Sequence, residues 1–153
     1  MSPRCWLMKS EPSDVSIDDL ASKPNQAVAW YGVRNYQARN FMRDQMSVGD
    51  KVLFYHSSCD EPGIVGLAVV SKQAYSDDTQ FDPKSPYFDP KATRSNPRWV
   101  NVEVKFIKKT RLVSIKELRE HPELANLRIL QKGNRLSITP VDPRDYEFIL
   151  GLL

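Results

Sequence analysis

The sequence predicts an α+β fold in which a small, curved and mostly antiparallel β-sheet or β-barrel of about six strands is flanked by short helices. Lys51–Ser57 and Gly63–Tyr75 contain the nearly unbroken apolar runs VLFY and IVGLAVV, and Arg98–Thr110 alternates apolar and polar residues. These strands follow one another without the regular helical crossovers of a doubly wound parallel sheet. The 153 residues are expected to form a single domain, 1–153, around one core.

The first half of the chain is predicted to contain four elements: a strand at Arg4–Lys9, a short helix capped by Ser16 and ended by Lys23-Pro24, an extended segment at Val28–Tyr31, and a helix from about Arg34 to Gln45. The first of these, RCWLMK, is rich in bulky apolar residues and is expected to be buried on both faces. In the longer helix, one face is expected to hold Ala38, Phe41, Met42 and Gln45.

The second half is predicted to begin with a turn at Val48-Gly49-Asp50 and to add four strands, at Lys51–Ser57, Gly63–Tyr75, Arg98–Thr110 and Leu136–Thr139. It also adds a helix at about Ile115–Glu120, capped by Ser114, and a final helix that opens with the N-cap Asp142 and Pro143. A basic cluster of Lys108, Lys109 and Arg111 is expected at the end of the third of these strands. Ser76–Pro97 is irregular and aromatic, and a loop of this length is expected to cover something.

Composition sets broad limits. A net charge of +3 and a pI near 8.9 permit a polyanionic partner without requiring one. Cys5 and Cys59 are expected to be reduced thiols, and no apolar run is long enough to span a bilayer. A cytoplasmic protein that acts as a monomer, away from membranes, is therefore expected.

Most catalytic signatures are absent, including GxGxxG, GxxxxGK[ST], GxSxG and HExxH. His56 and His121 do not lie at zinc-ligand spacing, so we expect no metal and no cofactor. His56 and Cys59 are interpreted as a hydrogen-bonded residue at a pocket rim and an apolar filler rather than a nucleophilic pair, and His121 as a cap at a helix end. Lys9 and Glu11 fit two interpretations equally: a proton-transfer pair or an ordinary pair in water.

Recognition chemistry is better represented. A flat base is held by aromatic faces, read at its edge by amide or hydroxyl groups, and followed by cations on the phosphates. Aromatic residues lie near predicted loops or strand ends at Trp30, Tyr31, Tyr55, Phe81 and Tyr87. Asn35 can both donate and accept hydrogen bonds, and the cations suited to phosphates are Lys9, Arg34, Arg39 and Arg43.

Taken together, six ordered motifs resemble the EVE domain, a member of the PUA-like superfamily. They are WLMKSEP at Trp6–Pro12, WYGVRNYQARNFMRD at Trp30–Asp44, VGDKVLFYHSS at Val48–Ser58, EPGIVGLAVV at Glu61–Val70, AYSDDTQFDP at Ala74–Pro83 and RLSITPV at Arg135–Val141. The resemblance covers nearly the whole chain and looks closest to stand-alone bacterial members. It implies a PUA-like curved β-barrel, similar to the YTH domain that reads methylated adenine in RNA.

The resemblance also implies a pocket for a modified base. By comparison with the YTH domain, the pocket is expected to comprise Lys9, Ser10, Trp30, Tyr31, Asn35, Tyr55, His56, Ser57, Phe81 and Tyr87, with Arg34, Arg39 and Arg43 on the phosphates. The long loop has no Trp, so its aromatic wall must come from Phe81, Tyr87 or Phe88. Asn35 is expected to read the base edge, helped by Ser57 and Ser10.

Three functions follow as hypotheses. The first is a non-catalytic module that binds nucleic acid, DNA or RNA, through a modified base. The alternative is a hydrolase acting on an acylated nucleoside, as in ASCH-type relatives, with Lys9 and Glu11 transferring protons. The third is a protein-interaction module whose pocket is vestigial.

Overall fold

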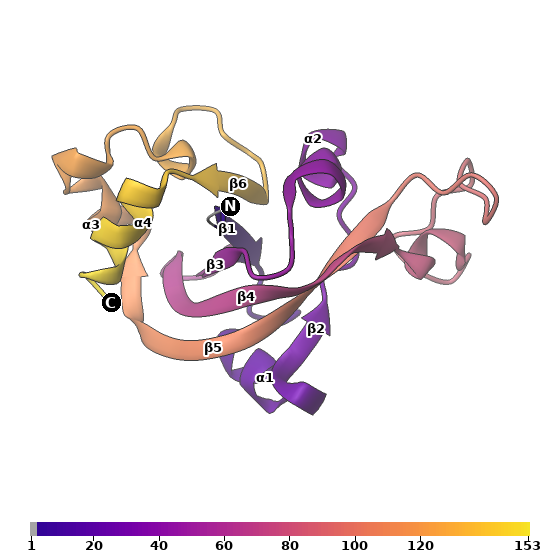
Figure 1. The fold of residues 1–153 in the computed structure, drawn as a ribbon, viewed down its shortest axis with the longest axis horizontal. Coiled ribbons are helices and arrows are strands. Elements are labelled where there is room, and N and C mark those ends of the chain that lie inside the picture. Colours follow the sequence, from indigo (N-terminus) through magenta and orange to yellow (C-terminus); the bar gives the residue numbers. More distant parts are fainter. Residues whose placement is uncertain (1–2) are drawn as a thin grey trace.

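Six strands of the described chain, residues 3–153 of a computed structural model, form one strongly curved sheet (Figure 1). Their order is β2-β5-β4-β3-β1-β6, and every neighbouring pair is antiparallel except β1 and β3. The edge strands β2 and β6 do not pair with each other, so the sheet is open rather than a closed barrel. The predicted α+β class with a curved, mostly antiparallel sheet is confirmed.

The strands are β1 (Cys5–Ser10), β2 (Ala27–Ala29), β3 (Lys51–His56), β4 (Gly63–Ser76), β5 (Val100–Ser114) and β6 (Ile138–Val141). The α-helices are α1 (Ile17–Ser22), α2 (Tyr36–Asn40), α3 (Ile115–Arg119) and α4 (Pro143–Leu150), and η2 (Phe41–Gln45) is a π-helical turn. Short 3₁₀ turns are η1 (Pro24–Gln26), η3 (Asp78–Phe81), η4 (Pro122–Leu124) and η5 (Arg128–Leu130). The predicted caps at Ser16, Ser114 and Asp142 are confirmed by hydrogen bonds from their side chains to the first turns of α1, α3 and α4.

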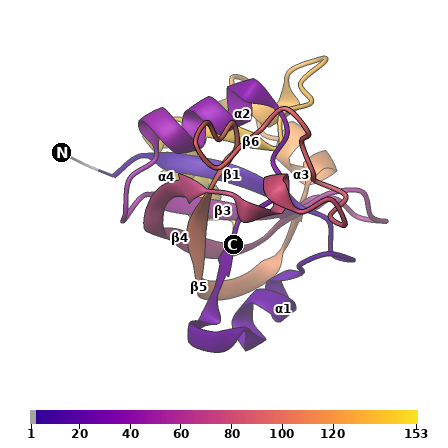
Figure 2. The same cartoon turned by 90° about the vertical axis from the view of Figure 1, so that its right-hand side faces the viewer.

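The central strands β1 and β3 are buried on both faces, as the apolar run in β1 predicts. Trp6 and Met8 face one hydrophobic cluster, whereas Cys5 and Leu7 face a second. The first cluster also takes side chains from α1, α2 and η2, and the second takes side chains from α3 and α4. In both views α2 lies above the strands and α1 below them (Figures 1 and 2), so the curved sheet encloses the first cluster between the two helices.

Several predicted boundaries differ from the structure, and those of β5 and β6 differ most. β5 continues to Ser114 instead of ending at Thr110, so Arg111, which was predicted beyond the strand end, lies within the strand together with Lys108 and Lys109. Register shifts between β4 and β5 break the simple alternation and hide the extra length. β6 begins and ends two residues later than predicted.

The helix after Asn35 changes its hydrogen-bond period. The amide of Met46 donates to the carbonyl of Phe41 at 2.9 Å, five residues back, which makes a π-helical turn. The extra residue rotates the chain, so Met46 is buried and Gln45 is exposed, contrary to the expected face. His121 occupies the N-cap position of η4, at a helix end as expected, but its side chain makes no cap hydrogen bond and its ring packs on Phe148.

Both cysteines are free thiols, Cys5 buried and Cys59 partly buried. Burial raises the pKa of the Cys5 thiol above its ordinary value. Within residues 3–153, no helix is long and apolar enough to cross a membrane.

His56 ties the end of β3 to α1. Its Nε2 accepts a hydrogen bond from the amide of Ile17 at 3.1 Å, so the ring must be neutral at that nitrogen. Burial lowers the pKa of His56 below its ordinary value of 6.5. The neutral imidazole therefore stabilises the fold above pH 6.5, and this contribution is lost as the pH falls through the lowered pKa.

We expect the wild-type protein to lose stability more steeply than His56→Gln when the pH is lowered from about 8 to about 5, because the glutamine oxygen accepts the same hydrogen bond without titrating in this range. Urea unfolding at each pH measures the difference. His121 is common to both proteins and cancels in the comparison. Parallel stability curves for the two proteins would contradict the assignment.

Candidate functional site

A cavity of about 470 Å³ opens where the carboxyl ends of β1 and β3 meet the residues that follow β2. It is lined by Lys9, Ser10, Glu11, Asp14, Val15, Val28, Ala29, Trp30, Tyr31, Gly32, Val33, Arg34, Ser57, Ser58, Tyr87, Arg135 and Ser137. The parallel pairing of β1 with β3, which sets Ser10 opposite His56, brings these two strand ends to one edge of the sheet. The volume lies within the usual range of ligand pockets, roughly 300–1,000 Å³.

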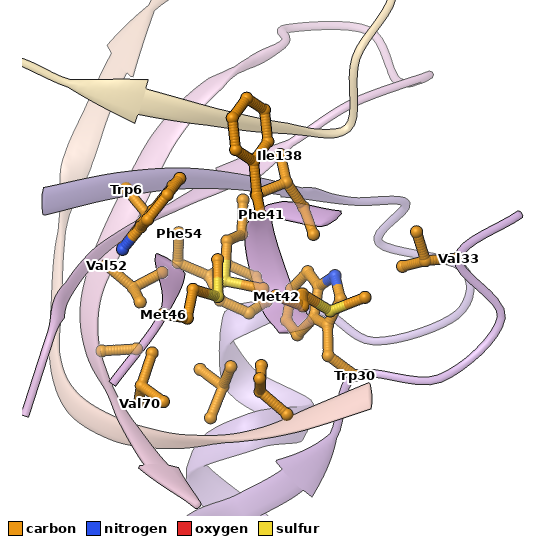
Figure 3. Close-up of a cluster of buried hydrophobic side chains, with 14 of the residues drawn as sticks. Trp6, Trp30, Val33, Phe41, Met42, Met46, Val52, Phe54, Val70 and Ile138 are labelled. Carbon is orange, nitrogen blue, oxygen red and sulfur yellow. The ribbon is translucent and has the colours of Figure 1, made fainter. Parts of the chain in front are cut away.

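Three aromatic residues, together with several aliphatic ones, contribute to the apolar part of the lining. Trp30 is 8% exposed and meets Phe54 edge to face, with ring centroids 5.7 Å apart, so its indole belongs to both the hydrophobic core and the cavity wall (Figure 3). Tyr31 is 47% exposed and lies at the mouth. Its ring meets Tyr87 edge to face at 5.8 Å.

Tyr87 is held in place by the backbone of the loop opposite. Gly32 has a φ of 82°, a conformation that favours glycine, and a Cβ atom there would lie 2.8 Å from Cζ of Tyr87. The ring of Tyr87 therefore occupies the space that any other residue at position 32 would need. This contact sets the width of the cavity on that side.

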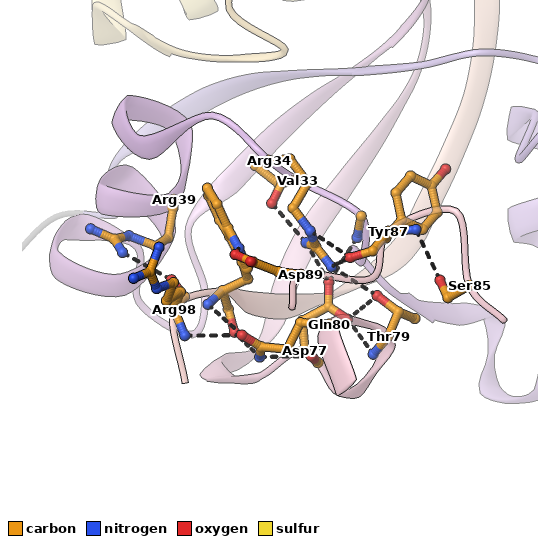
Figure 4. Close-up of polar contacts among 12 residues, drawn as sticks. Val33, Arg34, Arg39, Asp77, Thr79, Gln80, Ser85, Tyr87, Asp89 and Arg98 are labelled. Atoms are coloured by element: carbon orange, nitrogen blue, oxygen red, sulfur yellow. Dashed lines mark hydrogen bonds and ion pairs between the residues drawn. The ribbon is translucent and has the colours of Figure 1, made fainter. Parts of the chain in front are cut away.

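An ion pair between Arg34 and the buried Asp77 joins the segment that follows β2 to the segment that follows β4. Asp77 has no exposed surface, and its carboxylate accepts hydrogen bonds from the amide of Gly32 at 2.8 Å and from Arg34 Nη1 at 3.2 Å (Figure 4). The amide and hydroxyl of Thr79 donate to its other oxygen. The charge is thus paired and fully hydrogen-bonded, as a buried carboxylate requires.

Arg34 lines the cavity, but its guanidinium is used within the protein. Nε and Nη2 donate to the carbonyl of Tyr87 at 2.9 and 2.7 Å, and the remaining N–H groups donate to Val33, Asp77 and Thr79. All five N–H groups therefore have acceptors. The structure makes Arg34 an anchor for the Tyr87 loop and leaves it no free donor for a phosphate.

Gln80 holds the base of the same loop. It is fully buried, its amide nitrogen donates to the carbonyls of Asp77 and Trp99 at 2.8 Å, and its oxygen accepts from the amides of Arg98 and Trp99. The segment predicted to cover something is ordered by these contacts (Figure 4). Of its three expected wall residues, Tyr87 reaches the cavity, whereas Phe81 packs under Arg94 and Phe88 is exposed elsewhere.

Polar groups of both signs surround the aromatic walls. Burial lowers the pKa of Lys9, whose ammonium makes no ion pair or hydrogen bond with residues 3–153 and lies 6.0 Å from the ring of Tyr55. Burial, followed by the charge of Asp14 and smaller effects of Tyr31 and Glu11, raises the pKa of Tyr87. The carboxylates of Asp14 and Glu11 therefore act electrostatically on the cavity wall.

Several expected pocket residues lie outside the lining. Asn35 caps α2, and its Oδ1 accepts from the amide of Ala38 at 3.0 Å. Tyr55 packs in the second hydrophobic cluster, where burial raises its pKa to about 12. The Nε2 atom of His56 accepts a hydrogen bond from the amide of Ile17, and His56 does not line the cavity. The structure thus brings together Lys9, Ser10, Trp30, Tyr31, Ser57 and Tyr87, but not Asn35, Tyr55, His56 or Phe81.

The other two expected phosphate contacts are also engaged elsewhere. Arg39 donates to the carbonyl of Arg98 at 2.9 Å and stacks over Tyr36, 4.6 Å from its ring centroid. Arg43 forms a surface pair with its neighbour Asp44 at 2.8 Å. Neither lines the cavity.

Sequence reasoning missed several members of the lining, among them Asp14, Val15, Arg135 and Ser137. Asp14 and Val15 belong to the turn after β1, in which their amides donate to the carbonyl of Glu11. Ser137 is brought in by a hydrogen bond from the amide of Lys9 to its carbonyl at 2.8 Å. The RLSITPV motif contains both Arg135 and Ser137, but a short predicted strand does not by itself indicate that they line a cavity.

No group of His, Cys, Asp and Glu side chains in the described part of the chain is arranged to hold a metal ion. Lys9 and Glu11 both line the cavity but form no ion pair with each other. The lining is therefore one of aromatic faces, hydroxyls and separate charges.

An open curved sheet with an aromatic-walled cavity at its parallel strand ends defines a class of small α+β domains. The chain belongs to the EVE domain family, whose model matches residues 4–152. Among relatives, thymocyte nuclear protein 1 of Gallus gallus is 43% identical, over 96% of this chain and 67% of that protein.

Solved structures extend the likeness. A crystal structure of a Pseudomonas putida protein is 46% identical, with a TM-score of 0.92 over 97% of this chain and 98% of that one. Human THYN1, crystallised in complex with DNA containing 5-methylcytosine, is 41% identical, with a TM-score of 0.90 over 97% and 96% of the two chains. The YTH domain of Zygosaccharomyces rouxii MRB1, solved with N6-methyladenosine RNA, is 16% identical with a TM-score of 0.56, and shares the fold alone.

We expect Gly32→Ala to destabilise the protein by about 2–4 kcal/mol, because alanine disfavours the positive φ by about 1–2 kcal/mol and its methyl displaces the Tyr87 ring. Guanidinium unfolding measures the loss. Gly133→Ala is the matched control, since Gly133 has a φ of 80° but open space around it.

The difference between the two alanine variants isolates the contact with Tyr87. In the double variant Gly32→Ala/Tyr87→Ala the two losses should be less than additive, because the clash is removed. Equal losses for Gly32→Ala and Gly133→Ala would show that Tyr87 is not constrained by position 32.

Proposed function

We propose that this chain is a non-catalytic module that binds nucleic acid by taking a modified base into the cavity beside Trp30. The observation that carries the proposal is the aromatic lining formed by Trp30, Tyr31 and Tyr87 around a space of about 470 Å³. Flat bases bind between such faces, and the cavity has room for a base and its sugar. A relative that is 41% identical over nearly the whole chain was crystallised with methylated DNA, which supports the same proposal.

The base must leave its stack to reach this cavity, because a base inside a duplex exposes only its edges. We therefore propose that the bound nucleotide is turned outward from a duplex or taken from a single strand. 5-Methylcytosine is the first candidate, since it is the modified base named for the human relative.

A methyl group alone gives weak selectivity. Burying one methyl contributes about 0.8 kcal/mol, or roughly four-fold in affinity. Thymine carries the same methyl as 5-methylcytosine and differs by having a carbonyl in place of the exocyclic amino group. A cavity that favours 5-methylcytosine over both cytosine and thymine therefore needs an acceptor for the amino group as well as an apolar slot.

We assign that acceptor role to Glu11 and Asp14. Carboxylates are suited to the amino group of cytosine and repel the carbonyl of thymine. Both side chains line the cavity, and neither is paired or hydrogen-bonded with residues 3–153 through its carboxylate. Ser57 assists as a further polar group of the lining, whereas the oxygen of Asn35 caps α2 and is not free to read the base edge.

The proposal is tested with single-stranded oligonucleotides that differ only in one base: 5-methylcytosine, cytosine or thymine. We expect 5-methylcytosine to bind about four-fold more tightly than cytosine and about ten-fold more tightly than thymine, from the methyl and the charged hydrogen bond respectively. Fluorescence anisotropy gives the three dissociation constants. Equal affinity for all three bases would remove the proposal.

The aromatic wall is tested at Tyr31, which is exposed enough to be truncated without collapsing the core. Tyr31→Ala should weaken binding by roughly ten-fold, in line with the 1–3 kcal/mol of a base–aromatic stack. Tyr75→Ala is the control, because Tyr75 is similarly exposed at 43% and lies outside the cavity. The same loss in both variants would argue against a stacking role.

The carboxylates are tested with Glu11→Gln and Asp14→Asn together. The preference for 5-methylcytosine over thymine should shrink, while affinity for the thymine oligonucleotide should stay equal or rise because two negative charges near the phosphates are gone. Glu120→Gln, an exposed change of the same kind elsewhere, should alter neither. A uniform loss for all bases would instead indicate a structural role for the two acids.

A further inference from the structure

The arginines expected to bind phosphate are occupied. All five N–H groups of Arg34 donate to acceptors within the protein. Arg39 is stacked over Tyr36 and donates a hydrogen bond to the carbonyl of Arg98. Arg43 is paired with Asp44 at the surface. A strand whose base fills the cavity must therefore meet other cations.

Two such cations line the same cavity. Lys9 lies at the end of β1, and Arg135 lies in the segment that leads into β6. Neither side chain makes a hydrogen bond or ion pair with any residue of the described range, 3–153. They lie on adjoining parts of one wall, because the amide of Lys9 donates to the carbonyl of Ser137 at 2.8 Å.

The segment that carries Arg135, between η5 and β6, is anchored to the rest of the fold at both ends, although its tip is exposed. Ile129 is buried before it, and the side-chain amide of Gln131 donates to the carbonyls of Ala125 and Leu127. Gly133, with a φ of 80°, then turns the chain, and the segment rejoins the sheet at β6. Figures 1 and 2 both show this loop projecting beyond the strands. Arg135 is thus presented at the mouth without being tied down.

The lining carries charges of both signs. Glu11 and Asp14 repel phosphate, so a backbone crossing the mouth is favoured where the unpaired cations lie. A guanidinium can hold a phosphate with two parallel hydrogen bonds, whereas an ammonium acts as a point charge.

We infer that Arg135 and Lys9 hold the phosphates that flank the bound nucleotide, in place of the arginines at 34, 39 and 43. The inference rests on the proposed function, since it supposes that a nucleotide occupies the cavity. The two cations supply affinity for the nucleic acid backbone and no preference among bases, which remains the task of the aromatic walls and the carboxylates.

The test is the salt dependence of binding to the single-stranded 5-methylcytosine and cytosine oligonucleotides. Each phosphate contact contributes about 0.7 to the slope of log affinity against log salt concentration. Arg135→Gln and Lys9→Gln should each reduce the slope by about that amount. Arg135→Gln should lower affinity for both oligonucleotides by the same factor, so that their ratio is unchanged. Arg135→Lys should retain the slope.

Arg43→Gln is the control, because it removes one positive charge from an exposed position outside the cavity, and its slope should equal that of the wild type. Thermal unfolding of Arg135→Gln should match the wild type, since no hydrogen bond or ion pair of its side chain with residues 3–153 is lost. An unchanged slope in either variant overturns the assignment of that residue. This failure is distinct from failure of the proposed function, in which the wild type itself would show no preference between the two oligonucleotides.

Discussion

The buried carboxylate of Asp77 is the interaction on which the cavity depends. A charge with no exposed surface is tolerated only when every lone pair has a donor, and the donors here come from Gly32, Arg34 and Thr79. They fix the loop after β2 against the loop after β4. Arg34 then carries the constraint to the carbonyl of Tyr87, so one buried acid determines where two walls of the cavity lie.

Much of the fold could be predicted from local pattern. The apolar runs of β1 and β3 indicate burial on both faces, and the caps at Ser16, Ser114 and Asp142 mark helix starts. The extra length of β5 and the π-helical turn at Phe41–Gln45 could not, because bulges and a change of helical period follow from packing between distant segments. Local propensity contains no information about such contacts.

The site was harder to predict because a residue type does not reveal its partner. Arg34 is a plausible phosphate ligand from the sequence, but its acceptors at Asp77, Thr79 and Tyr87 lie far along the chain. Asn35 has an amide suited to a base edge, yet capping α2 uses its oxygen. The position of Tyr55 was accessible: it alternates with Phe54 and shares the face of Leu53, which points into the second cluster.

The contact between Gly32 and Tyr87 links two distant positions in the sequence to one dimension of the cavity. Bulk added at one of them requires bulk to be removed at the other, while the sheet behind them stays the same. The distance between the two walls can therefore be changed by placing a larger residue at position 32 and a smaller one at position 87. Such an exchange offers a way to redesign the domain for larger or smaller nucleobase adducts without rebuilding its core.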